Sequence, residues 1–404
     1  MRIGMFAWES LFSIKVGGMA PHVTELAEAL AKRGHEVHIF TRRGDFDAFD
    51  RINGVYYQRS PAGGDGDIVS QMKRMSEALF DSFERVQKIY GMFDIIHGHD
   101  WHPVPALSRI KEEYHHPYLL TVHSTEWGRS GGHFRDDAVF AEISKREMAG
   151  IHESSRIIVA TERMQGEVRE IYSVPQEKIT VIANGIVRRK NPGSLDSKEA
   201  KDVEERYGMK ERLGMEPQGR MVLFCGRMTY QKGPDLLAKA IPFILEKHSD
   251  VMFIFAGDGD MSSECKRLAE YFKVQRSCRF LGYVSNQEKK RLLDACDIVC
   301  VPSRNEPFGI IILEAWDAGK TVVATEAVSI IQNFADGLLA YIQPESLAWC
   351  INRLLGDPIE MERLGRAGRN RIENEFGWDQ IAERTEAVYN MCEGLMNYPG
   401  EAGQ

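Results

Sequence analysis

The amino-acid sequence predicts an α/β protein built from two Rossmann-like, doubly wound domains. Short apolar runs rich in β-branched residues alternate with longer helical patterns along the chain. This alternation occurs twice, because a charged stretch with several glycines and prolines, residues 187–220, separates two similar series of strands. A length of 404 residues also suits two α/β domains better than a single core.

The expected strands are short apolar runs bounded by glycine, proline or polar residues. In the first half they are Ile3–Ala7, Glu36–Phe40, Ile95–His97, Tyr118–Val122, Arg156–Val159 and Ile179–Ile182. In the second half they are Val222–Cys225, Met252–Ala256, Arg279–Leu281, Ile298–Val301 and Thr321–Ala324. An amphipathic helical pattern follows, from Trp378 to Leu395.

We therefore expect a division of the chain into four parts. An N-terminal Rossmann-like domain spans residues 1–186, and residues 187–220 form a connection with a helical insertion. A C-terminal Rossmann-like domain spans 221–376, and residues 377–404 form a final helical segment. Ligands of open α/β sheets bind beyond the carboxyl ends of the strands, so functional residues are expected in the loops that follow strands.

Composition and charge exclude several classes of protein. A formal net charge of -8 argues against nucleic acid as the main partner. The longest apolar runs are too short to span a membrane, and the first residues lead into a strand pattern rather than a signal peptide, so we expect a cytoplasmic protein. The sequence gives no indication of an oligomeric state.

The cysteines predict neither a disulfide framework nor a zinc site. All seven lie from Cys225 onward, and no Cys-x-x-Cys pair occurs among them. We expect reduced cysteines buried in the core.

Two carboxylates frame a helix start in the second half. Residues 296–302 predict a buried strand, which places Glu306 in the next loop and the helix start near Gly309. Unpaired N–H groups at such a helix start favour phosphate, and Glu314 lies about one and a half turns into the helix, where it can accept hydrogen bonds from a ribose diol. Spacing alone leaves open that Glu306 is a solvated loop residue and Glu314 a surface residue.

The run Glu306-Pro307-Phe308-Gly309-Ile310-Ile311-Ile312-Leu313-Glu314 resembles the Glu-x7-Glu motif of the retaining family 4 glycosyltransferases, which have the GT-B fold. The resemblance covers nearly the whole chain. It implies an acceptor-binding N-terminal domain facing a nucleotide-sugar-binding C-terminal domain across a cleft, with the last helix packing on the N-terminal domain. It also implies that Glu306 holds sugar hydroxyls, that Glu314 binds the ribose, and that the segment Phe308, Gly309, Ile310 and Ile311 binds the donor.

A pair of cations follows another expected strand of the second half. Arg227 and Lys232 are five positions apart around a turn that opens a helix, so both can converge on one diphosphate. Arg and Lys occur often at helix starts, so a pair at this spacing is common in proteins. It resembles the Arg-x4-Lys pair of family 4, which implies that the two cations stabilise the departing nucleoside diphosphate.

A paired glycine follows the first expected strand. In Lys15-Val16-Gly17-Gly18-Met19, Gly17 and Gly18 allow close approach of the backbone to a ligand, and Lys15 supplies a charge for phosphate. A plain tight turn is the alternative. The segment resembles the Lys-x-Gly-Gly-Leu stretch of glycogen and starch synthases, which implies a contact with the donor phosphate.

Histidines follow two further strands of the first half. His97-Gly98-His99-Asp100-Trp101-His102 raises the possibility of a metal site, but it resembles the His-x-His-Asp-Trp stretch of glucan synthases, where no metal is implied. Trp101 and His102 either line the acceptor side or pack the strand end. His123 ends another strand and can hydrogen-bond a sugar hydroxyl. A structural role is its alternative, and resemblance to the cleft histidine of the family implies a donor-sugar contact.

Two Asp-x-Asp sequences are interpreted as turns rather than metal sites. Asp65-Gly66-Asp67 and Asp258-Gly259-Asp260 lie in glycine-rich turns, where aspartate is favoured for local hydrogen bonds. No metal and no cofactor is expected.

The reaction implied by the resemblance is transfer of a hexose, with glucose expected, from ADP-glucose or UDP-glucose to an acceptor hydroxyl with retention of configuration. No enzymic nucleophile is evident, which agrees with a front-face mechanism. An α-glucan is one acceptor, and a lipid, a cell-surface polysaccharide or a small metabolite are alternatives. Residues 325–330 lack the usual Gly-Gly-Glu, which leaves the sugar open. A phosphorylase or epimerase, and a catalytically silent binding protein, are the rival classes.

Overall fold

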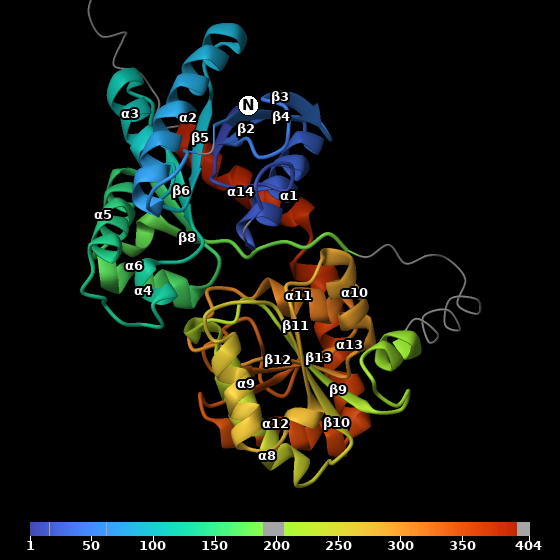
Figure 1. Cartoon of the computed structure of the whole chain (residues 1–404). Coiled ribbons are helices and arrows are strands. Elements are labelled where there is room, and N and C mark those ends of the chain that lie inside the picture. The colour runs from blue at the N-terminus through green and yellow to red at the C-terminus, as the bar shows by residue number, and fades with distance from the viewer. Residues whose placement is uncertain (16, 62, 189–205, 394–404) are drawn as a thin grey trace, which may run out of the picture. The chain divides into compact units, whose positions relative to one another are not determined.

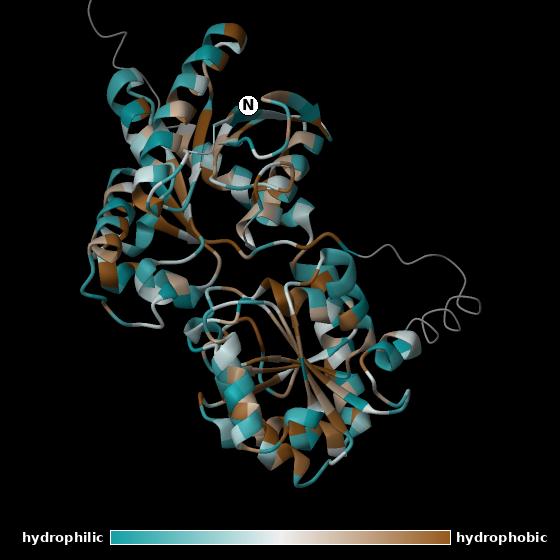
Figure 2. Cartoon of the chain, in the orientation of Figure 1, coloured by the Kyte–Doolittle hydropathy of each residue, from teal (hydrophilic) through white to brown (hydrophobic). Residues whose placement is uncertain are grey.

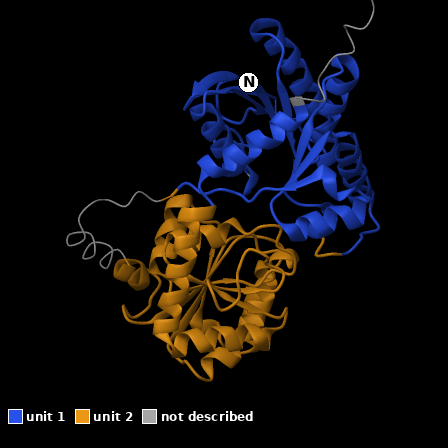
Figure 3. Ribbon diagram, turned by 180° about the vertical axis from the view of Figure 1, so that it is seen from behind, with its two compact units in different colours: residues 1–129, 133–187, 376–404 blue, residues 130–132, 188–375 orange. Residues whose placement is uncertain are grey.

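The computed structural model describes residues 1–15, 17–61, 63–188 and 206–393 (Figure 1). The chain divides into two compact units (Figure 3). Unit 1 comprises residues 1–129, 133–187 and 376–404, and unit 2 comprises residues 130–132 and 188–375. Each unit is an α/β domain with its own sheet and its own apolar core.

The sheet of unit 1 has the strand order β3-β4-β2-β1-β5-β6-β7-β8 (Figure 1). Its strands are β1 (Arg2–Phe6), β2 (Glu36–Arg42), β3 (Phe49–Ile52), β4 (Val55–Ser60), β5 (Ile95–His99), β6 (Leu119–Val122), β7 (Arg156–Val159) and β8 (Ile179–Val181). All pairings are parallel except the β3–β4 hairpin; Ile3, for example, lies opposite Val37 on β2 and Ile95 on β5. The order reverses between β1 and β5, where a doubly wound sheet opens a crevice for ligands.

Helices cover both faces of this sheet. They are α1 (Met19–Lys32), α2 (Ile68–Tyr90), α3 (Val104–Tyr114), α4 (Glu126–Arg129), α5 (Ala138–Glu153), α6 (Glu162–Tyr172) and α14 (Trp378–Glu393), with a 3-10 turn η1 (Gln176–Lys178). Phe6 of β1 belongs to a core cluster with residues of α2, α3, α5 and α6, while its neighbour Met5 belongs to a cluster with residues of α1 and α14. Period-two alternation along β1 thus feeds one core on each face.

The sheet of unit 2 has the strand order β11-β10-β9-β12-β13-β14, with parallel pairing between all neighbours. Its strands are β9 (Arg220–Cys225), β10 (Val251–Ala256), β11 (Cys278–Gly282), β12 (Ile298–Val301), β13 (Thr321–Thr325) and β14 (Leu338–Ala340). In chain order this is the 3-2-1-4-5-6 arrangement of a dinucleotide-binding fold. The order reverses between β9 and β12.

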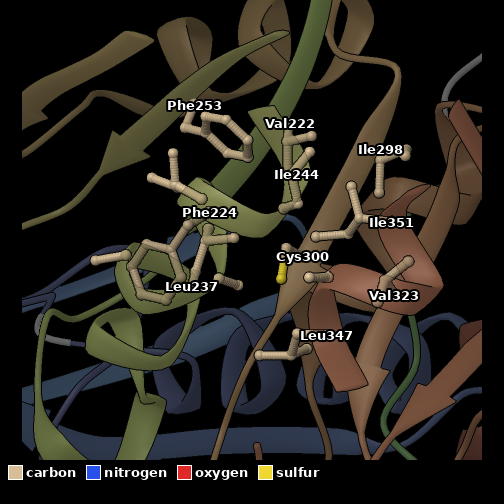
Figure 4. Packing of buried hydrophobic residues seen from close by; sticks show 14 of the residues in the cluster. Val222, Phe224, Leu237, Ile244, Phe253, Ile298, Cys300, Val323, Leu347 and Ile351 are labelled. Atoms are coloured by element: carbon tan, nitrogen blue, oxygen red, sulfur yellow. The ribbon is translucent and has the colours of Figure 1, made fainter. Parts of the chain in front are cut away.

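Helices pack on the sheet of unit 2, and some of them contribute to an apolar core (Figure 4). They are α8 (Pro234–Leu245), α9 (Ser262–Tyr271), α10 (Asn286–Ala295), α11 (Ile310–Asp317), α12 (Pro344–Gly356) and α13 (Pro358–Glu375), with the 3-10 turns η2 (Tyr230–Lys232) and η3 (Gln275–Ser277). Residues 206–212 are also helical. Figure 2 shows the apolar residues gathered on the strands and the polar residues on the outer sides of the helices, the pattern of buried parallel sheets.

The predicted fold class is confirmed, and each predicted strand overlaps an observed one. Arg156–Val159 and Ile298–Val301 have the predicted bounds. The sequence interpretation missed three strands, β3, β4 and β14. Asn53 and Gly54 join β3 to β4 with φ values of 51° and 89°, and Asn-Gly is the usual sequence of such a two-residue hairpin turn, so a signal for this hairpin was present.

Three further expectations from the sequence concern the connection between the domains, the cysteines and membrane-spanning segments. Half of the predicted connection at 187–220, residues 189–205, lies outside the described residues. All seven cysteines are free; six are buried and Cys225 is half-buried. Within the described part of the chain, no helix is both long and apolar enough to cross a membrane.

Candidate active site

The loops that follow β9 and β12 meet at the carboxyl edge of the unit 2 sheet. The two strands pair directly, with Ile298 opposite Val222 and Val299 opposite Leu223. This is the point where strand order reverses, and therefore the place where the fold opens a ligand crevice. Arg227 and Lys232 follow β9, and Glu306 follows β12.

Lys232 and Glu306 form the central pair of this edge. The Lys232 ammonium lies 2.7 Å from Glu306 Oε1 and 2.9 Å from Oε2, and the Ser303 hydroxyl donates to Oε2 at 2.8 Å. Glu306 is only 4% exposed. A buried carboxylate is costly without a cation and hydrogen-bond donors, and Lys232 and Ser303 together provide them and fix the position of Glu306.

A glycine allows the two loops to approach each other. Gly233, directly after Lys232, has φ +63°, and a Cβ atom there would collide with the carbonyl oxygen of Pro302. Only glycine fits that contact without strain. The close approach explains how Lys232 reaches Glu306, although the two are 74 positions apart.

Arg304 holds the two loops together. Its guanidinium donates to both carboxylate oxygens of Asp235, at 2.8 Å and 2.7 Å, and its backbone N–H donates to the carbonyl of Gln231 at 2.8 Å. Bidentate pairs of this kind fix orientation as well as contributing energy. The sequence interpretation missed Arg304 and Asp235, because a pair 69 positions apart leaves no local signal.

Arg227 lies in the same loop as Lys232, with a less constrained side chain. It is exposed, and its guanidinium is 3.4 Å from Gln231 Oε1, near the outer limit of a hydrogen bond. The backbone below it is firmly held, because Met228 N–H donates to the carbonyl of Asp258 at 2.8 Å. The structure thus places two cations on one loop, one anchored and one free to reorient.

Helix α11 begins beside Glu306. Gly309 takes φ +92°, and a Cβ atom at this position would lie 2.7 Å from Ile312 Cδ1 and 3.3 Å from Glu306 Cγ. Phe308 is buried, whereas Ile310 and Ile311 are half-buried. The first N–H groups of the helix have no partner within it and carry the positive end of its dipole. An anion would be stabilised at this position.

Glu314 projects from the second turn of α11 toward α10. Its carboxylate lies 2.6 Å from the ammonium of Lys289, and the two side chains are 23% and 26% exposed. A carboxylate has about four lone-pair sites, so Glu314 can accept hydrogen bonds from a diol while it is paired with Lys289.

In unit 1 the glycine pair lies at the start of α1. Gly17 N–H donates to Glu9 Oε2 at 2.8 Å, and Glu9 is buried. Gly18 caps α1 with φ -71°, which any residue can adopt. A left-handed backbone therefore does not explain why glycine stands at this position. Lys15 is exposed. Glu9 is a contact of this segment that the sequence interpretation did not identify.

His123 directly follows β6, and its backbone is fixed by Asp100. The backbone N–H of His123 donates to Asp100 Oδ1 at 2.6 Å. Burial lowers the pKa of the His123 imidazole to about 4, so it is neutral at pH 7. Burial also raises the pKa of Asp100 to about 6.

A buried ionic cluster supports the segment after His123. Arg129 lies 2.8 Å from Glu126 and 2.6 Å from Glu147, and it donates to the Ser124 hydroxyl at 2.7 Å. Glu147 also accepts from the Glu126 N–H and from the Tyr172 hydroxyl. Burial raises the pKa of Glu147 to about 7. The cluster fixes the turn that carries His123.

Trp101 and His102 are packing residues in the structure. They are 3% and 6% exposed. The His102 ring stacks between Trp101 and Trp8, with centroid distances of 4.2 Å and 4.3 Å. Two alternatives were stated for Trp101 and His102, lining the acceptor side or packing the strand end. Their burial and stacking correspond to the second. His97 is likewise buried in β5, between Tyr389 and Thr121.

The Asp-x-Asp turns make local hydrogen bonds. Asp67 caps α2 by accepting from the N–H and the hydroxyl of Ser70, at 2.9 Å and 2.8 Å. Asp258 accepts from Gly259 N–H at 2.8 Å and from the Ser262 hydroxyl at 3.0 Å. These hydrogen bonds lower the pKa of both carboxyls, the behaviour expected of turn aspartates.

Comparison with known proteins decides the family. The model of Glycosyltransferase Family 4 matches residues 16–189, and that of Glycosyl transferases group 1 matches residues 208–371. An uncharacterized glycosyltransferase of Methanocaldococcus jannaschii is 35% identical, over 98% of this chain and 100% of its own length. The chain belongs to glycosyltransferase family 4. It is therefore a transferase enzyme.

Two further comparisons support this assignment. The glycogen synthase of Mycobacterium tuberculosis is 27% identical, over 96% of this chain and 94% of its own length. The solved structure of sucrose-phosphate synthase from Thermosynechococcus elongatus superposes with a TM-score of 0.78 at 21% identity, covering 98% of this chain and 99% of that chain. The fold of this family 4 glycosyltransferase is thus GT-B.

Proposed function

We propose that this family 4 glycosyltransferase moves a hexose, with glucose expected, from a nucleoside diphosphate sugar to an acceptor hydroxyl with retention of configuration. One observation carries the proposal: a buried Glu306 is paired with Lys232 beside the start of α11, at the point where the strand order of unit 2 reverses. Those groups supply what a nucleotide-sugar needs, namely donors for phosphate and acceptors for sugar hydroxyls.

The leaving group is stabilised by positive charge that is already in place. Lys232 is fixed by Glu306, and Arg227 can swing toward a bound diphosphate. The N–H groups of Gly309 to Ile311 add the positive end of the α11 dipole. Donors held in position before reaction lower the barrier where negative charge develops.

The remaining groups bind the sugar and the ribose. Glu306 accepts hydrogen bonds from hexose hydroxyls, and Glu314, oriented by Lys289, accepts them from the ribose. Resemblance to the family assigns a donor-sugar contact to His123, and its neutral imidazole can hydrogen-bond a hydroxyl. The same resemblance assigns phosphate contacts to Lys15 and to the Gly17 and Gly18 backbone.

We assign a front-face mechanism without an enzymic nucleophile or a metal. The bond from the anomeric carbon to the diphosphate oxygen breaks, and a bond to the acceptor oxygen forms on the same face. The acceptor proton passes to the departing phosphate oxygen. The anomeric configuration of the product, measured by NMR coupling constants, tests this assignment, because inversion would exclude it.

The donor and the acceptor are tested together. ADP-glucose and UDP-glucose are the proposed donors and an α-glucan is the proposed acceptor, since the glycogen synthase comparison covers nearly the whole chain. Release of nucleoside diphosphate is measured with ADP-, UDP- and GDP-sugars, with and without glycogen or maltooligosaccharide, in EDTA. Glucan-dependent release supports the proposal. Release that requires a lipid, a cell-surface polysaccharide or a small metabolite instead would replace the glucan while leaving transfer intact.

A further inference from the structure

Three histidines from separate elements of unit 1 meet in one cluster. His22 comes from α1, His99 ends β5, and His123 follows β6. One ring nitrogen of each lies within 4.8 Å of the others. Of the histidines in the segment 97–102, only His99 belongs to this cluster, and His22 gave no local signal in the sequence.

The spacing within the cluster resembles that of metal ligands. His99 Nδ1 lies 3.1 Å from His123 Nε2. With Zn–N bonds of 2.0–2.1 Å, two ligand nitrogens at a tetrahedral zinc are about 3.3 Å apart. The His22 ring is 4.6 Å from His123 and 5.6 Å from His99, measured between centroids, and one of its nitrogens lies within 4.8 Å of the other two ligand nitrogens.

Unsatisfied nitrogens in the cluster point to a missing ligand. Both ring nitrogens of His22 and the Nε2 of His99 are buried without a hydrogen bond of normal geometry among the described residues. Buried polar atoms without a partner are rare, and a site that binds an ion or water is a common reason for them. A cation among the three rings would give one of the His22 nitrogens a partner, with His99 binding through Nδ1.

The chemistry of the donors selects the class of ligand. Burial lowers the pKa of His22, His99 and His123, so all three rings are neutral and offer lone pairs near pH 7; Asn184 is the one neighbour that favours a charged His22. Three imidazoles without a carboxylate suit Zn²⁺, Cu²⁺ or Ni²⁺ and not Mg²⁺ or Ca²⁺.

We propose that His22, His99 and His123 bind one late first-row divalent cation of the zinc class, with a fourth position open to water. Coordination displaces the His99–His123 hydrogen bond, and neutral rings need only change tautomer, so no net proton is released. One consequence rests on the proposed function, in which His123 contacts the donor sugar. When the cation holds the His123 ring, that contact cannot form. The cation therefore inhibits transfer, which itself needs no metal.

Calorimetric titration of the full chain with ZnCl₂ in chelator-free buffer tests the site. We expect one ion per chain, with affinity lowered at least tenfold in His22→Gln and in His99→Gln. His152→Gln, which alters an exposed histidine on α5, is the matched control and should leave the affinity unchanged. An unsaturable titration, or equal affinity in both cluster variants and the wild type, would overturn the proposal.

A second measurement uses only the unaltered protein and so does not depend on how the variants fold. Crystals soaked in Zn²⁺ should give an anomalous difference peak among the three rings at the zinc edge, and a peak only elsewhere would contradict the site. Inhibition is then measured against donor concentration. Inhibition competitive with the donor and reversed by EDTA is expected. Zinc bound in the cluster without inhibition would support the site and contradict the role assigned to His123.

Discussion

At the scale of single residues, the partners of the buried Glu306 carboxylate decide both its position and part of the stability of unit 2. The carboxylate is almost fully buried and depends on Lys232 and Ser303. Removing one partner of a buried charge pair leaves the other uncompensated, whereas replacing both can be nearly neutral. The pair therefore has a stability effect that can be separated from its effect on activity.

Lys232→Met should lower both stability and activity. We expect a loss of ~1–3 kcal/mol in the free energy of unfolding, because the Glu306 carboxylate stays buried without its cation, and a loss of about 10²–10³ in kcat/KM from the missing phosphate donor. Urea unfolding and steady-state rates measure the two effects. The double variant Lys232→Met/Glu306→Gln should recover stability but not activity. Equal stability of the single variant and the wild type would contradict the account.

At the scale of elements, the start of α11 requires a backbone that other residues avoid. Gly309 has φ +92° and lies between Ile312 and Glu306. It sets both the direction of the helix and the position of its first N–H groups. Gly233 plays the corresponding part in the loop after β9, where it admits the Pro302 carbonyl.

Gly309→Ala should therefore destabilise unit 2 and weaken donor binding together. A left-handed conformation costs an alanine about 1–2 kcal/mol, and the added Cβ also crowds Ile312. Thermal unfolding and the KM for the donor measure the two effects. Gly356→Ala is the matched control, because a Cβ there meets no atom within 4 Å. Similar behaviour of the two variants would rule out a special role for Gly309.

The positions of these elements could be predicted from the sequence, but several of the contacts between them could not. Apolar runs located the parallel strands, and the end of the strand pattern at Pro302 followed by Gly309 located the helix start, because both are local patterns. Arg304–Asp235, Glu9 and the partners of His22 are set by tertiary contacts between distant segments. Trp101 and His102 belong to a local motif, but whether they face ligand or core is decided by neighbours such as Trp8.

At the scale of the whole molecule, the two units differ in their response to acid. Eleven of the twelve histidines lie in unit 1, and His248 alone lies in unit 2. Burial lowers the pKa of several in unit 1: His22, His38, His97, His99, His102 and His123. A histidine with a lowered folded pKa stabilises fully above its unfolded pKa of about 6.5, and that stability is lost as the pH falls.

Unit 1 should thus lose stability before unit 2 between pH 6.5 and pH 4.5. Asp100 and Glu147 oppose this trend, because a carboxyl with a raised pKa stabilises at low pH, but the histidines outnumber them. Hydrogen exchange of peptides from each unit, measured across this range, checks the prediction. Earlier loss of protection in unit 2 would contradict it.

The most direct test of the central claim compares two glutamate variants of the full chain. Release of nucleoside diphosphate is measured in EDTA with the donor and acceptor found for the wild type. Glu306→Gln should lose about 10²–10³ in kcat/KM, since a group that acts in the transition state is removed. Glu345→Gln, an exposed residue in the first turn of α12, should retain wild-type rates. Wild-type activity in Glu306→Gln would contradict the account.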